Sequence, residues 1–204
     1  MKRQDKKFDL VVVGGGHAGI EAALIAHKRG VKTLLISMDK NSVGRTSCNP
    51  AVGGLAKGQM VKEVDVLGGM MGAFADLSTL QSKTLNKSKG RSVWSPRSQI
   101  DKNLYEKIAQ GYIKKVGLEV LEAEVVSLHV KNNSILGVFL RDKTKISCFS
   151  VVLTCGTFLN GLIHIGREQI KAGRYGEKRS EGITENLNSL GLVSGRLKTG
   201  TPPR

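Results

Sequence analysis

Cysteine is scarce in this chain, and the few cysteines present are not arranged in pairs. The 204 residues include three, at positions 48, 148 and 155, and no C-x-x-C motif occurs. An odd and sparse set of this kind argues against a disulfide framework and against a zinc site. We therefore expect a protein of the reducing cytoplasm with no bound metal.

Long apolar runs and aromatic residues are also missing. No run approaches the roughly 20 residues of a membrane-spanning helix, so no membrane span is expected. The basic N-terminal segment MKRQDKK has no apolar stretch behind it, unlike a secretory signal. Aromatic residues make up 4% of the chain, which disfavours a stacking platform for single-stranded nucleic acid.

Acidic residues are few relative to basic ones. The chain has 17 Asp and Glu against 32 Lys and Arg, for a formal net charge of +15. Such an excess predicts attraction to polyanions, above all to nucleic acid. A generally basic proteome, or a fragment whose acidic half lies elsewhere, would give the same excess. Apolar residues, at 40%, are enough for one globular domain with a core.

The chain is organised around the segment 8–30, which reads FDLVVVGGGHAGIEAALIAHKRG. The apolar run 10–13 is typical of a buried parallel strand. A G-x-G-x-x-G motif, formed by Gly14, Gly16 and Gly19, follows this run. Apolar residues then recur at helical spacing, so the motif joins a predicted strand to a predicted helix.

Strand, glycine turn and helix in this order are typical of dinucleotide binding. Gly14 would permit the tight turn, Gly16 would let a pyrophosphate approach the backbone, and Gly19 would let helix and strand pack closely. The helix N-terminus would then face the anion. A plain βα turn has the same spacing, and the glycines alone do not choose between FAD and NAD.

Two residues downstream each have two interpretations. Asp39 comes slightly late after the second predicted strand, so it either binds a ribose or lies in an exposed turn. Cys48 lies in a predicted loop, 41–58, that is rich in Gly, Asn and Ser. Arg45 and Lys57 could lower the pKa of its thiol and make it a nucleophile or redox group. The alternative is an inert, packed thiol.

The rest of the pattern predicts an α/β domain. Helices are expected at 59–67, with Met60, Val64 and Leu67 facing the core, and after Asp101, with Ile100, Leu104 and Ile108 on one face. Strands are expected at 32–37, 118–130, 135–140, 145–151 and 151–154. The segments 83–97 and 171–179 are basic, and each is either a solvated loop or a phosphate contact. The expected fold is a three-layer α/β fold with a parallel sheet and an antiparallel β meander inserted at about 120–150.

Several longer motifs together resemble one family. They are VVVGGGHAGIEAA at 11–23, SCNPAVGGLAKG at 47–58, LNKSKG at 85–90, VWSPR at 93–97, VVLTCGTFLNG at 151–161, HIG at 164–166 and GRLKTGTPPR at 195–204. In this order they resemble the tRNA uridine 5-carboxymethylaminomethyl modification enzymes, also called the glucose-inhibited division protein A family. The second and last motifs are far more specific than a generic flavin fingerprint.

The resemblance implies a Rossmann-like FAD-binding fold of the glutathione-reductase type. It also implies an activity: with a GTPase partner, the family installs an aminomethyl or carboxymethylaminomethyl group at carbon 5 of the wobble uridine of certain tRNAs. The reaction uses methylenetetrahydrofolate, glycine or ammonium, and NADH to recycle the flavin. The implied cofactors are FAD and NADH, and the implied partners are tRNA, the GTPase and a second copy in a homodimer.

The resemblance also assigns roles to individual residues. The FAD pyrophosphate is implied to lie on Gly14, Gly15, Gly16, His17, Ala18 and Gly19. Val125 falls where the family contacts the adenine side through its backbone, and Ser180 falls at another cofactor contact. Cys48 matches a cysteine of the SCNP loop that has a proposed catalytic role.

This chain departs from the family mildly in sequence and strongly in length. Ile20 stands where many members have a small residue or cysteine, and Gly90-Arg91-Ser92 replaces a common Gly-Pro-Ala. The family's NADH-binding part, the rest of its FAD domain and its helical C-terminal region are expected to lie outside this chain. Residues 1–204 are thus expected to form the N-terminal part of a FAD-binding domain. A general FAD-dependent oxidoreductase and a truncated, non-catalytic nucleotide-binding fragment remain as other hypotheses.

Overall fold

The computed structural model describes residues 8–47 and 49–198, so Cys48 lies outside the described residues. The helices are α1 (His17–Lys28), α2 (Lys57–Val66), α3 (Met71–Ser78), α4 (Lys102–Lys115) and α5 (Ile183–Ser189). The strands are β1 (Phe8–Val13), β2 (Thr33–Ser37), β3 (Ala51–Gly53), β4 (Thr79–Leu85), β5 (Ser95–Ile100), β6 (Glu119–Glu122), β7 (Val125–Lys131), β8 (Ser134–Leu140), β9 (Lys145–Leu153), β10 (Ile163–Ile165) and β11 (Glu168–Ile170). Short 3₁₀ turns lie at Lys40–Ser42, Lys87–Lys89 and Arg91–Val93.

One sheet of the described chain has the strand order β6-β2-β1-β9-β8-β7. Strands β6, β2, β1 and β9 pair in parallel, whereas β8 and β7 are antiparallel additions. The predicted parallel sheet with an antiparallel meander is therefore confirmed. The predicted strands at 145–151 and 151–154 form one strand, β9, whose first residues pair with β8 and whose later residues pair with β1. The meander is thus continuous with the parallel sheet.

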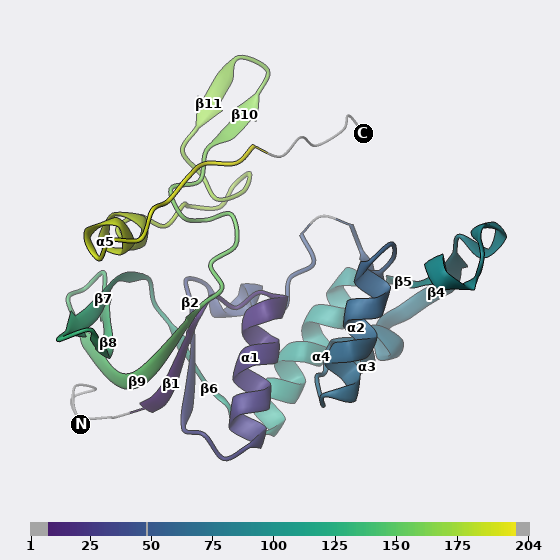
Figure 1. Ribbon diagram of the computed structural model, residues 1–204, viewed down its shortest axis with the longest axis horizontal. Coiled ribbons are helices and arrows are strands. Elements are labelled where there is room, and N and C mark those ends of the chain that lie inside the picture. Colours follow the sequence, from purple (N-terminus) through teal and green to yellow (C-terminus); the bar gives the residue numbers. More distant parts are fainter. Residues whose placement is uncertain (1–7, 48, 199–204) are drawn as a thin grey trace.

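The parallel strands are buried on both faces because each face carries its own core. Val12 and Leu35 point to a core formed with helices α1, α3 and α4. Val11, Leu34 and Ile36 point to a second core formed with the meander and α5. Figure 1 shows this layering, with α1–α4 on one side of the sheet and β7, β8 and α5 on the other. Continuous apolar runs on β1 and β2 are what two covered faces require, and the predicted fold class is confirmed.

Strands β3, β5 and β4 form a separate antiparallel sheet that was not predicted from the sequence. The predicted loop at 41–58 contains β3, and the basic segment 83–97, for which a solvated loop was one interpretation, lies mostly in β4, β5 and the turns between them. Most of β4 is exposed and polar, so it lacks the alternation of apolar residues that identifies a strand.

Two predicted helix faces were wrong in part, although Ile100 is buried and Ile108 packs against the core as predicted. In α2, Met60 and Leu67 are 63% and 75% exposed. In α4 the buried residues are Tyr105, Ala109 and Ile113 rather than Leu104, which is 43% exposed. The register differs because Ile100 ends strand β5 and Asp101 caps the helix, its carboxylate accepting the N–H groups of Asn103 and Leu104.

Candidate functional site

The glycine turn between β1 and α1 is held by both neighbouring strands. Gly14 N–H donates to Ile36 O (2.8 Å) on β2, and Thr154 N–H donates to Val13 O (2.8 Å) from the end of β9. Gly14 has a φ of +113°, which favours glycine. A Cβ on Gly19 would lie 1.9 Å from Gly14 O, so only glycine lets the helix approach the turn. Both positions are therefore fixed by the fold itself.

Gly16 is different, because a Cβ built there would meet no atom of the described residues within 4 Å. Its φ of −74° is open to any L-residue. Gly16 is also the N-cap of α1, where no side chain caps the helix and no acidic residue occupies the first turn. The open space and the uncapped N–H groups at this helix N-terminus are the features that an anionic ligand needs.

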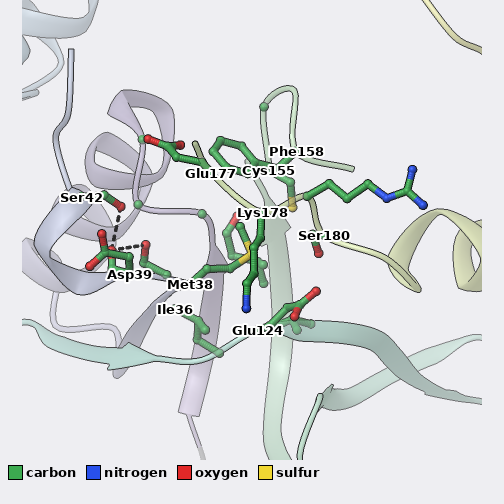
Figure 2. A pocket seen from close by; sticks show the side chains of 18 of the residues that line it. Ile36, Met38, Asp39, Ser42, Glu124, Cys155, Phe158, Glu177, Lys178 and Ser180 are labelled. Atoms are coloured by element: carbon green, nitrogen blue, oxygen red, sulfur yellow. Dashed lines mark hydrogen bonds between the residues drawn. The ribbon is translucent and has the colours of Figure 1, made fainter. Parts of the chain in front are cut away.

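A cavity of about 500 Å³ lies at the carboxyl ends of β1, β2 and β9. Its lining includes Gly14, Gly15 and Gly16 of the turn and Val125 at the start of β7. The segment 174–180, which contains Ser180, lines it as well. In Figure 2 the side chain of Lys178 extends into this cavity. The carboxyl edge of an open parallel sheet is where ligands of α/β proteins bind, and the volume suits a small-molecule ligand.

The structure thus brings five of the predicted cofactor residues to one cavity: Gly14, Gly15, Gly16, Val125 and Ser180. The other three do not line it. Ala18 is exposed in the first turn of α1, and Gly19 is buried beneath that turn. His17 packs edge-on against Tyr105, with ring centroids 5.5 Å apart. Its Nδ1 is buried and has no hydrogen-bond partner among residues 8–47 and 49–198, and burial lowers the pKa of this imidazole.

Charged residues around the cavity were mostly not predicted, because they come from distant segments. Arg45 Nη1 donates to Glu177 Oε1 at 3.1 Å. The same guanidinium lies 3.9 Å from Glu106 and 3.9 Å from Asp39. Arg45 was expected to act on the Cys48 thiol; it also holds three carboxylates from three segments together. The effect on Cys48 stays a prediction.

Asp39 lines the cavity and caps the 3₁₀ turn that follows β2, its Oδ1 accepting Asn41 N–H at 2.8 Å. A position near a ligand and a role in a turn are therefore both present at this residue. Glu124, also in the lining, accepts two hydrogen bonds from Arg141, at 2.5 and 2.6 Å. These bonds lower the pKa of Glu124, whereas burial raises the pKa of the Cys155 thiol.

A second cavity, of about 380 Å³, lies on the other side of Arg45. Thr46, Ser47, Lys102 and Tyr175 are in its lining. Thr46 Oγ1 and Ser47 Oγ are buried and have no hydrogen-bond partner within the described residues. Unsatisfied buried hydroxyls are uncommon in folded proteins, so these two hydroxyls stand out within the part of the chain that the structure describes. Within the described residues no cluster of side chains could hold a metal ion.

Comparison with known proteins identifies the family of this chain. A family model described as glucose inhibited division protein A matches residues 9–204. The chain belongs to this family. It is 48% identical to the tRNA uridine 5-carboxymethylaminomethyl modification enzyme MnmG of Karelsulcia muelleri, over 98% of this chain and 33% of the relative. It is 49% identical to the enzyme of the same name from Cytophaga hutchinsonii, over 97% of this chain and 32% of the relative.

Solved structures of the family have the same fold. The Aquifex aeolicus GidA structure in its form II crystal superposes with a TM-score of 0.86 at 46% identity, covering 90% of this chain and 30% of that one. The glucose inhibited division protein A resemblance and the fold class expected from sequence are both confirmed. The chain spans about a third of the length of the curated relatives it matches. None of the described helices is long and apolar enough to cross a membrane.

Proposed function

We propose that this chain is the FAD-binding portion of an enzyme that modifies the wobble uridine of tRNA. The observation that carries the proposal is the cavity at the glycine turn of a chain that is nearly half identical to enzymes named for this modification. The product would be a (carboxymethyl)aminomethyl group at carbon 5 of the uridine. The rest of the activity would need the parts of the relatives that this chain does not match.

The residues present fit FAD. The pyrophosphate would lie on the backbone at Gly14–Gly16, where Gly16 leaves open space in front of the uncapped start of α1. The backbone of Val125 would contact the adenine side, and Ser180 would supply a further polar contact from the opposite wall. Arg174 and Lys178 line the same cavity and favour an anionic ligand.

His17, Ala18 and Gly19 would support the pyrophosphate indirectly, by forming the first turn of α1 behind Gly16. Bound FAD would supply the redox chemistry of the reaction. NADH would reduce the flavin from a site outside the matched third of the relatives. Asp39 remains a candidate for a ribose contact because it lines the cavity after β2.

The proposed macromolecular partners are tRNA, a GTPase and a second copy of the full-length protein. The net charge of +15 supports a polyanionic partner. The basic residues of segments 83–97 and 171–179 would contact phosphates, so tRNA affinity should fall steeply with salt. A cytoplasmic location agrees with the sparse, unpaired cysteines and with tRNA as substrate.

A chimera tests the proposed function. The matching N-terminal third of the Cytophaga hutchinsonii relative is replaced by residues 9–204 of this chain and expressed in cells that lack the enzyme. Wobble-uridine modification is then measured by mass spectrometry of digested tRNA. Restored modification supports the proposal. A folded chimera that binds FAD but leaves the uridine unmodified would favour a general FAD-dependent oxidoreductase or a non-catalytic fragment.

The same chimera tests Cys48, which lies outside the described residues. Cys48→Ser should keep FAD and tRNA binding and lose most of the modification if the thiol acts chemically. Cys148→Ser is the matched control, because that thiol is buried in the core beneath the meander. Turnover of the Cys48→Ser chimera at the unsubstituted rate would show that Cys48 is structural.

A further inference from the structure

Strands β4 and β5 form a ribbon that projects beyond helices α2 and α3 (Figure 1). The third strand of this sheet, β3, pairs only with residues 97–99 of β5. The 3₁₀ turns Lys87–Lys89 and Arg91–Val93 form its tip. Asn86 and Gly90 shape the tip with positive φ values of 59° and 93°. Where the tip joins β5, the side chain of Gln59 on α2 donates to Trp94 O at 3.2 Å. The ribbon is therefore a formed element that is tied to the helical layer.

The ribbon carries positive charge that no described side chain neutralises. Residues 77–100 contain five Lys and Arg and no Asp or Glu: Lys83, Lys87, Lys89, Arg91 and Arg97. Lys83 and Arg97 lie directly opposite each other in the strand register. Like charges at such positions destabilise a sheet. Within the described chain none of the five belongs to an ion pair. A bound polyanion would remove this repulsion.

The only tryptophan of the sequence stands at the tip of this charged ribbon. Trp94 is 39% exposed. Its Nε1 donates to Lys87 O at 3.2 Å, and the Arg91 guanidinium carbon lies 5.8 Å from the ring centre. The indole is thus oriented by the ribbon itself while part of its surface faces solvent. A fixed, partly exposed indole among cations is the arrangement that stacks an unpaired base.

We propose that the ribbon tip, residues 86–94, binds a single-stranded RNA loop, with one unpaired base on Trp94 and neighbouring phosphates on Lys83, Lys87 and Lys89. The scarcity of aromatic residues disfavours a platform for several bases, and one indole serves one base. The inference rests on the proposed function, because it specifies which part of this chain meets tRNA and which feature of the RNA it recognises. Double-stranded RNA has no free base and would meet only the charges.

Intrinsic fluorescence tests the contact without any substitution, because all tryptophan emission comes from position 94. The chain is titrated with an RNA hairpin whose loop has the length of an anticodon loop. A blunt RNA duplex with the same number of phosphates is the control ligand. We expect the hairpin to quench the emission by stacking and the duplex to leave it nearly unchanged.

Substitutions then separate stacking from charge. Trp94→Ala should weaken hairpin binding about tenfold or more, whereas Trp94→Phe keeps most of the affinity. Lys87→Ala/Lys89→Ala should reduce the slope of log affinity against log salt by about 1.4, near 0.7 per phosphate contact of a single strand. Lys114→Ala/Lys115→Ala, which removes the same charge from the exposed end of α4, should leave the slope unchanged.

The outcomes distinguish this inference from the function on which it rests. Quenching by the hairpin alone, together with the loss in Trp94→Ala, supports the stacking contact. Salt-dependent RNA binding that is equal for wild type and Trp94→Ala, with no quenching, overturns it and leaves tRNA binding elsewhere on the chain intact. Absence of binding to either RNA overturns both the stacking contact and the RNA-binding role of this chain.

Discussion

The Thr154 hydroxyl shares its proton between two successive carbonyls, Val13 O at the end of β1 at 2.9 Å and Gly14 O in the glycine turn at 3.1 Å. Thr154 follows the last residue of β9, 140 residues after Gly14, so the end of one strand fixes the turn that follows another. The same hydroxyl would lie 2.7 Å from a Cβ on Gly19. Three segments therefore meet at one oxygen atom, directly beside the proposed pyrophosphate position.

Thr154→Val should destabilise the fold, because it removes the hydroxyl donor while keeping the shape of the side chain. A partly buried carbonyl, Gly14 O, then loses a donor, at a cost of about 1–2 kcal/mol. For a chain of this size the melting temperature should fall by about 2–8 °C. Thr157→Val is the matched control, since that exposed hydroxyl makes only a 3.4 Å contact with Gly173 O. Equal melting temperatures of the two variants would show that the Thr154 hydroxyl does not fix the turn.

Arg141 and Glu124 make a pH-dependent contribution to stability. The hydrogen bonds from Arg141 hold the pKa of Glu124 below its ordinary 4.5. A lowered carboxyl pKa stabilises the folded state above the unfolded value and ceases to do so as the pH falls through the folded value. Arg141→Gln should therefore cost about 1 kcal/mol near pH 7, a modest effect because Arg141 is more than half exposed. The difference from wild type should shrink below about pH 4.5.

Urea unfolding at several pH values measures this difference. Arg167→Gln is the control, because Arg167 is exposed and belongs to no ion pair among the described residues. A gap between Arg141→Gln and wild type that stays constant from pH 7 to below pH 4 would contradict the linkage to Glu124.

The described cysteines should react with thiol reagents at different rates. Burial raises the pKa of Cys148 to about 11 and leaves its side chain 3% exposed. Cys155 is half-buried and lines the cavity at the glycine turn. With iodoacetamide at pH 8, Cys155 should be alkylated faster than Cys148, and added FAD should slow the reaction of Cys155 alone. Peptide mass spectrometry gives both rates, and faster labelling of Cys148 would contradict the packing described for the meander.

The sequence predicts the fold well where apolar runs and glycines dictate it. The runs Val11–Val13 and Leu34–Ile36 are buried on both faces, as a central parallel strand requires, and the turn at Asn132-Asn133 joins β7 to β8. Exposed polar strands cannot be predicted in this way. Strand β4 is mostly exposed and gains its pairing from β5, so neither burial nor alternation marks it in the sequence.

The site was predictable only where its residues form one local motif or match the family. Gly14 and Gly16 follow from the motif spacing, whereas Gly15, Val125 and Ser180 follow from the resemblance alone. The cluster of Arg45 with Glu106 and Glu177 joins residues as far as 132 positions apart. No local sequence pattern predicts such contacts, because they form when the loop after β2 packs against α4 and the segment before α5.

Gly16 offers the most direct test of the account, since the protein has room for a side chain there and the proposed cofactor does not. A Cβ at position 16 meets no atom of the described residues within 4 Å and the φ is ordinary, so Gly16→Val should fold. Gly111→Val, an equal change in open space on α4, is the control. We propose measuring FAD dissociation constants by flavin fluorescence, alongside thermal melts of all three proteins. We expect wild type and Gly111→Val to bind FAD with the same affinity. Gly16→Val should bind FAD about 100-fold or more weakly, because its side chain would occupy the pyrophosphate position. Equal FAD affinity of Gly16→Val and wild type would contradict the account.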